Sequence, residues 1–127
     1  PLAILNQETN FTLVDSISKK IRVIQEVTDS LKLKNTTAIA GRAENIKGKF
    51  DFVVTRAVAP MQKLMYWTKG KFKHANLHEK RNGLIALKGG DLAGELQNIS
   101  AVVQPISDYF SEVFFESKSI VYATVKK

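Results

Sequence analysis

The chain has 127 residues, and its 19 lysines and arginines against 12 aspartates and glutamates give a formal net charge of +7. It has no cysteine and only two histidines, which excludes disulfides and cysteine nucleophiles and argues against a metal centre. No apolar run reaches the roughly 20 residues that a membrane-spanning helix needs. We therefore expect a cytoplasmic protein with one domain over residues 1–127, whose basic charge favours a polyanion such as a nucleic acid.

The first third of the chain alternates between helical and extended patterns. Residues 1–5 are typical of a helix with Pro1 in its first turn. Residues 10–16 are predicted as a strand, and isoleucines, valine and leucine recur at helical spacing over 17–31. Ser16 is placed to cap that helix. Residues 36–41 form a further short strand that ends at a glycine.

The rest of the chain continues with strands, helices and connecting loops. The predicted elements are a polar turn or brief helix over 42–49, a strand over 50–56, a helix over 60–70, a loop over 71–83, a strand over 84–90, a helix over 91–100 with Asp91 as its cap, and two adjacent antiparallel strands within 111–127.

Strands that alternate with helices predict an α/β fold with a mostly parallel sheet and helices on both faces. Right-handed crossovers place the carboxyl ends of all parallel strands at one edge, where such sheets bind ligands. Asp15, Arg56 and Lys88 each stand at the end of a predicted strand. We therefore expect these three side chains to lie around one cleft.

Asp15 follows a strand and precedes a helix. An acidic residue at that place can accept hydrogen bonds from both hydroxyls of a ribose, or it can simply cap the helix. The stretch with Ala43 and Glu44 suits a loop that passes close to an adenine, although taken alone it is more typical of an ordinary loop with a helix start.

Cations stand at two strand ends and at the start of the first long helix. A guanidinium at the position of Arg56 can bind a carboxylate of a ligand, or form a structural ion pair with Asp15 or Glu44. Lys88 precedes two glycines that let a substrate approach the backbone, or that make a plain turn. The third group of cations can contact phosphates or simply form a solvated surface; its members are Lys19, Lys20 and Arg22.

Four stretches resemble, in order and spacing, the family of ribosomal RNA small subunit methyltransferase G, also called glucose-inhibited division protein B. They are FTLVDSISKKIRVIQEV, GRAENI, FDFVVTRAVAP and LIALKGG. The resemblance implies a Rossmann-like class I methyltransferase that uses S-adenosylmethionine to methylate N7 of a guanine in 16S ribosomal RNA. The small ribosomal subunit or its RNA is then the partner.

The resemblance also implies roles for individual residues. Asp15 and Ser16 would hold the cofactor ribose, Ala43 and Glu44 would lie beside the adenine, and Arg56 would bind the cofactor. It implies a catalytic place near the substrate for Lys88, and RNA contacts for three cations, Lys19, Lys20 and Arg22.

One departure from the family pattern concerns the first strand and its glycine-rich loop, which precede residues 1–5 in the family and are absent from this sequence. The resemblance therefore implies an incomplete fragment that does not bind the cofactor normally. Two other classes stay open: a non-catalytic RNA-binding α/β module, and a nicotinamide-dependent dehydrogenase in which Asp15 would hold the ribose equally well.

Overall fold

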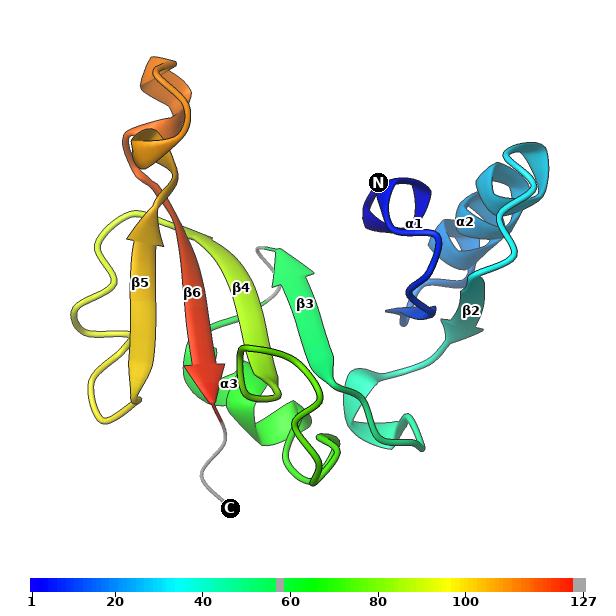
Figure 1. The fold of residues 1–127 in the computed structure, drawn as a ribbon, viewed down its shortest axis with the longest axis horizontal. Helices are drawn as coiled ribbons and strands as arrows, with labels where there is room; N and C mark the ends of the chain where they lie inside the picture. The colour runs from blue at the N-terminus through cyan, green and yellow to red at the C-terminus, as the bar shows by residue number, and fades with distance from the viewer. Residues whose placement is uncertain (57–58, 125–127) are drawn as a thin grey trace. The chain divides into compact units, whose positions relative to one another are not determined.

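The computed structural model describes residues 1–56 and 59–124. The chain divides into two compact units, Pro1–Ile46 and Lys47–Lys127 (Figure 1). Ala57 and Val58, which belong to the third stretch of the family resemblance, and the last three residues of the expected C-terminal strand lie outside the described residues. That the whole chain forms one domain stays a prediction.

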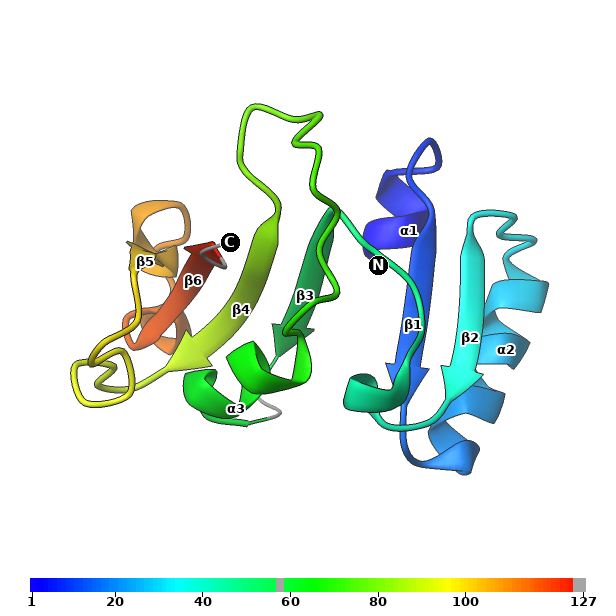
Figure 2. The ribbon, with the colours of Figure 1, turned by 90° about the horizontal axis from the view of Figure 1, so that it is seen from below.

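The first unit is built on two parallel strands. Its elements are α1 (Leu2–Leu5), β1 (Phe11–Asp15), α2 (Ser18–Ser30), β2 (Thr36–Ala40) and the 3-10 helix η1 (Ala43–Asn45). The register runs from Phe11 opposite Thr36 to Asp15 opposite Ala40, so both strands end at the same edge (Figure 2). Helix α2 packs on β1 and β2 and buries Ile21, in keeping with its apolar spacing.

A buried amide connects α1 and the following turn to the start of β2. The Nδ2 atom of Asn35 lies 3.0 Å from the carbonyl oxygen of Ala3, 3.1 Å from that of Asn6 and 2.9 Å from that of Thr9. Buried carbonyl groups need such partners, because an unpaired one costs about the free energy of a lost hydrogen bond. Asn35 therefore helps to fix the N-terminal segment on the two strands.

The second unit contains a mixed four-stranded sheet in the order β3-β4-β6-β5. Strands β3 and β4 are parallel, whereas β6 is antiparallel to β4 and to β5. The elements are β3 (Phe52–Arg56), α3 (Met61–Trp67), β4 (Gly83–Gly89), β5 (Ala101–Pro105), the 3-10 helices η2 (Ile106–Asp108) and η3 (Val113–Phe115), and β6 (Lys118–Thr124).

One face of this sheet carries the core. Successive residues of a strand point to opposite faces, and Leu84 and Ala86 of β4 lie on the same face as their partners Ala123 and Val121 in β6. All four side chains are fully buried, and α3 contributes Met61 and Leu64 to the same cluster. On the other face Val54 of β3 is half exposed. The core therefore lies between the sheet and α3.

Parallel and antiparallel strands together confirm the predicted α/β class, while the absence of a first strand stays an expectation. Two predicted elements are wrong. Residues 91–100 form turns instead of a helix, because Gly94 interrupts the segment and Asn98 adopts a left-handed φ of 67°. Residues 118–124 form β6 as a strand, but its antiparallel neighbours are β4 and Ala101–Pro105 (β5), and residues 113–115, expected within the strand pair, form a 3-10 turn.

Candidate functional site

The carboxyl ends of β1 and β2 bring four of the predicted site residues to one edge of the first unit. The Gly41 amide donates to the Asp15 carbonyl oxygen at 2.9 Å, so the turn that leaves β2 lies against the end of β1. Ser16 follows directly, and Ala43 and Glu44 form the 3-10 turn two residues after Gly41. The end of β1 and the turn that follows β2 therefore lie at the same edge. The predicted binding roles of Asp15, Ser16, Ala43 and Glu44 stay predictions.

The two carboxylate oxygens of Asp15 have different surroundings. Oδ1 accepts a hydrogen bond from the Ile17 amide at 2.9 Å, whereas Oδ2 lies 3.8 Å from the Lys20 ammonium. The side chain is 31% exposed. The carboxylate is thus oriented by one oxygen, while the other oxygen can accept a hydrogen bond from a ligand hydroxyl.

The expected capping role of Ser16 is wrong. Helix α2 begins at Ser18, with Ile17 at the N-cap position and no side-chain cap bond. Asp15, one residue earlier than Ser16, instead accepts the Ile17 amide through its carboxylate. The alternative in which Asp15 supports the helix start therefore holds for one of its oxygens, which leaves the other for a second task.

Glu44 lies at the edge with 34% of its side chain exposed, and its Oε1 is 3.7 Å from Nε of Arg42. An exposed ion pair at this separation is screened by water and holds neither group tightly. Lys19, Lys20 and Arg22 lie in the first turns of α2 and are exposed. This end of the first unit therefore combines carboxylates at the strand ends with cations on the adjoining helix.

In the second unit, Arg56 and Lys88 end neighbouring parallel strands but point to opposite faces of the sheet. Arg56 lies opposite Leu87, and Lys88 is the next residue, so strand alternation directs its side chain to the face that carries Leu84 and Ala86. The expectation that both cations point into one shared cleft is therefore wrong for this pair. What holds is that β3 and β4 end at the same edge.

Arg56 is exposed, and within residues 47–56 and 59–124 no salt bridge engages its guanidinium. A structural ion pair inside its own unit is thus not what holds this cation. Its binding role stays a prediction.

Lys88 is the more buried cation, with 10% of its side chain exposed. Its Nζ lies 2.5 Å from Oε1 of Glu95 and donates to the carbonyl oxygen of Ala59 at 2.5 Å. The same Glu95 oxygen accepts the amide of Met61 at 2.8 Å. The Lys88 ammonium and, to a smaller degree, the Met61 amide hold the pKa of Glu95 below its usual range, against the opposing effect of burial.

Sequence reasoning missed Glu95, which lies in the segment that was expected to be helical. One physical argument could have found Glu95. A lysine at the end of a buried strand is rarely buried without an acidic partner, and Glu95 is an acid seven residues after Lys88. The predicted catalytic role of Lys88 stays a prediction, because its contacts show only which protein groups its ammonium holds.

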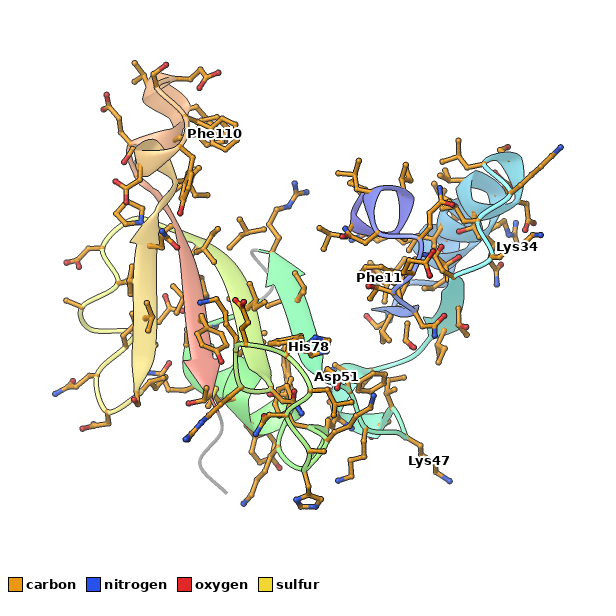
Figure 3. All side chains as sticks on the ribbon, viewed as in Figure 1. Phe11, Lys34, Lys47, Asp51, His78 and Phe110 are labelled. Carbon is orange, nitrogen blue, oxygen red and sulfur yellow. The ribbon has the colours of Figure 1, made fainter. Side chains whose placement is uncertain are left out.

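The opposite end of the β3–β4 pair has its own polar cluster. Asp51, which precedes β3, binds the Lys73 ammonium at 2.7 Å, and the His78 ring packs on Phe52 with ring centres 5.5 Å apart (Figure 3). In the part of the chain that the structure describes, no group of three or more His, Asp or Glu side chains is placed to hold a metal ion. None of the helices described is long and apolar enough to cross a bilayer.

Comparison with known proteins gives a consistent similarity. A family model described as rRNA small subunit methyltransferase G matches residues 1–120. Proteins named ribosomal RNA small subunit methyltransferase G are 48% identical in Christiangramia forsetii and 50% identical in Flavobacterium psychrophilum, each over 99% of this chain. The chain spans 60 and 61% of the length of these two curated relatives.

Two solved structures share the fold at 10% sequence identity. One is a mutant of MtNAS in complex with S-adenosylmethionine, with a TM-score of 0.65 over 98% of this chain and 49% of that protein. The other is an rRNA methylase from Streptococcus thermophilus, with a TM-score of 0.59 over 92% of this chain and 74% of that one. At this identity the likeness concerns the fold alone.

Proposed function

Because the chain belongs to the rRNA small subunit methyltransferase G family, we propose that it supplies the cofactor edge of an S-adenosylmethionine-dependent methyltransferase. The proposed substrate is N7 of a guanine in 16S ribosomal RNA, presented by the RNA or by the small ribosomal subunit. The proposed place of action is the cytoplasm, where ribosomes are modified. Family membership favours neither the dehydrogenase nor the non-catalytic module.

The residues at the end of β1 fit the ribose of such a cofactor. A ribose presents two adjacent hydroxyl donors, and within the described residues the Lys20 ammonium at 3.8 Å is the one salt-bridge partner of Asp15 Oδ2. The hydrogen bond from the Ile17 amide to Oδ1 fixes the direction of the carboxylate. Ser16 adds a hydroxyl next to it, and the turn with Ala43 and Glu44 begins at the same edge, as an adenine-binding loop requires.

The chemistry asks for positioning more than for acid–base catalysis. S-adenosylmethionine supplies a methyl group on a positively charged sulfur. The N7 atom of guanine carries a free lone pair, so no general base has to remove a proton before attack. The residues of the chain then have to align the groups and tolerate the movement of positive charge to the base. Cations of α2, Lys19, Lys20 and Arg22, are proposed to hold RNA phosphates outside the reacting centre.

The observation that carries the proposal is the shared edge of β1 and β2, where the hydrogen bond from the Gly41 amide joins the Asp15 position to the turn with Ala43 and Glu44. The test uses a protein that carries this chain at the full length of its curated relatives, with labelled S-adenosylmethionine and small subunits that lack the modification. We expect label in 16S RNA as 7-methylguanosine.

A matched pair of variants then tests the cofactor edge. Asp15→Asn keeps an acceptor for the Ile17 amide but removes the charge, and should weaken cofactor binding about 10-fold or more, since a hydrogen bond to a charged group contributes about 1.5–3 kcal/mol. Asp29→Asn changes an exposed acid near the far end of α2 and serves as the control. Equal cofactor affinity in Asp15→Asn and the control would refute the ribose assignment, and label in another base would refute the N7 assignment.

A further inference from the structure

A partly buried ion pair, Lys88 and Glu95, holds the chain where it enters α3. The Lys88 ammonium donates to the Ala59 carbonyl oxygen, and the Glu95 carboxylate accepts the Met61 amide. These two backbone groups flank Pro60, which has no amide hydrogen of its own to donate. A second contact joins the same segments, because the side-chain amide of Gln62 donates to the carbonyl oxygen of Glu95 at 2.7 Å. Lys88 in β4 and Glu95 in the segment after β4 therefore both bind backbone groups at the start of α3.

The pair is poorly explained as a source of stability alone. Lys88 and Glu95 are 10% and 23% exposed, and removing charges from water costs about as much as their attraction returns. Apolar side chains of similar size would fill such a place equally well. What apolar side chains cannot do is hold a carbonyl and an amide on either side of a proline at fixed positions. The contacts thus favour a geometric task.

The place that the pair holds is the carboxyl edge of the parallel strands. Ala59 is three residues beyond Arg56, the end of β3, and Lys88 is the penultimate residue of β4. Ligands of parallel α/β sheets bind outside this edge, between the segments that leave neighbouring strands. Holding Ala59 and Met61 against the end of β4 therefore sets the positions of backbone groups close to this edge.

We propose that Lys88 and Glu95 are positioning residues for methyl transfer, which hold Ala59 and Met61, at the start of α3, against the end of β4. This inference rests on the proposed function. It assigns to Lys88 a task carried out through Ala59 and Glu95, and it adds Glu95, to which the sequence assigned no role. Because neither group has to touch the reacting atoms, their loss should slow the transfer step more than it weakens cofactor binding.

The test compares three variants in the protein at the full length of its relatives. Lys88→Met removes the ammonium but keeps the apolar stem. Glu95→Gln keeps an acceptor for the Met61 amide and removes the charge. Lys88→Arg keeps a cation that can reach both partners. Lys73→Met is the matched control, because it removes a salt bridge of 2.7 Å in the same unit at the opposite end of β3. For each protein kcat, KM for S-adenosylmethionine and the folded fraction are measured.

We expect kcat per folded molecule to fall about 10- to 100-fold in Lys88→Met and Glu95→Gln, since a displacement of about 1 Å at a reacting centre can cost that much. The KM for S-adenosylmethionine should change much less, Lys88→Arg should regain part of the rate, and Lys73→Met should keep the wild-type kcat. If Lys88→Met does not fold, the kcat per folded molecule of Glu95→Gln tests the proposal.

Two other outcomes are distinguishable. A purely structural pair would lower the folded fraction and leave kcat per folded molecule unchanged in Glu95→Gln, which would overturn the inference while the proposed function stands. A wild-type protein without methyl transfer would overturn the proposed function itself, and the positioning role with it.

Discussion

The substitution Arg56→Ala should separate an effect on cofactor affinity from an effect on the free energy of unfolding. Arg56 is exposed at the end of β3, on the face opposite the core, and within residues 47–56 and 59–124 no salt bridge engages it. Arg56→Ala therefore removes no salt bridge within the described residues of that unit. Surface substitutions of this kind change the free energy of unfolding by about 0.5 kcal/mol or less.

The cofactor affinity should respond far more strongly. If Arg56 binds a charged group of S-adenosylmethionine, its removal costs about 1.5–3 kcal/mol, which corresponds to a dissociation constant about 10- to 150-fold higher. Arg56→Lys should recover only part of that loss, because an ammonium cannot form the two parallel hydrogen bonds of a guanidinium. Weaker binding without weaker folding is the expected signature.

Calorimetric titration with S-adenosylmethionine measures the affinity, and urea unfolding of the same samples measures the stability. Arg81→Ala is the control, because it removes an exposed arginine just before β4, at the start rather than the end of the strands. An affinity for the cofactor within about threefold of the control would contradict the role of Arg56. So would a loss of unfolding free energy large enough to account for the weaker binding.

Two further predictions concern charge. Replacing Lys19 and Lys20 together by glutamine should reduce the slope of log RNA affinity against log salt concentration by about 1 for each lysine. An unchanged slope would show that these lysines do not contact phosphates. The pKa of Glu95 is lower in the folded than in the unfolded chain, so its ionised form stabilises the fold above its ordinary pKa of 4.5, and this contribution is lost as the pH falls through the lower folded value. In urea unfolding, wild type should therefore exceed Glu95→Gln in stability at pH 6, and the difference should shrink towards pH 3; a constant difference would contradict the assignment.

Strong periodicity made the first unit predictable. The apolar spacing of residues 17–31 matches α2 at Ser18–Ser30 to within one residue, and the strands at Phe11–Asp15 and Thr36–Ala40 lie inside the predicted ranges. In each case the local pattern and the tertiary burial agree: Ile21, for example, belongs to the apolar spacing of α2 and is its buried residue. Where both levels point to one structure, the sequence is sufficient.

The segment after β4 shows where local reasoning ends. Its residues read as helical, and Leu92, Leu96 and Ile99 do pack on the core. Gly94 and the left-handed Asn98 break the backbone into turns, so the apolar spacing serves tertiary packing without a regular helix. The second C-terminal strand was also predicted at the wrong place. The apolar and aromatic residues 113–115 are typical of a strand but form a 3-10 turn, and the strand beside β6 is the short Ala101–Pro105.

The candidate site divides along the same line. Asp15 and Arg56 could be found because each is the last residue of a recognisable strand. The opposite directions of the Arg56 and Lys88 side chains depend on a register that places Arg56 opposite Leu87. A shift of one residue would have turned Lys88 to the face of Arg56. Residues 52–54 and 84–87 are apolar at every position, so their hydrophobic pattern does not distinguish the two faces of the sheet or indicate this register.

Lys88 is a charged residue at a strand position where the pattern of its neighbours favours an apolar one. A strand that continues the pattern of Leu84 and Ala86 would be expected to place a third apolar residue at position 88, beside the core. A lysine there requires an acid, and the acid in turn requires a segment that can bring it back to the strand end, which the turns around Glu95 provide. Because an apolar trio would stabilise the unit at least as well, the charged arrangement is best understood through the backbone groups of Ala59 and Met61 that it holds at the edge of the sheet.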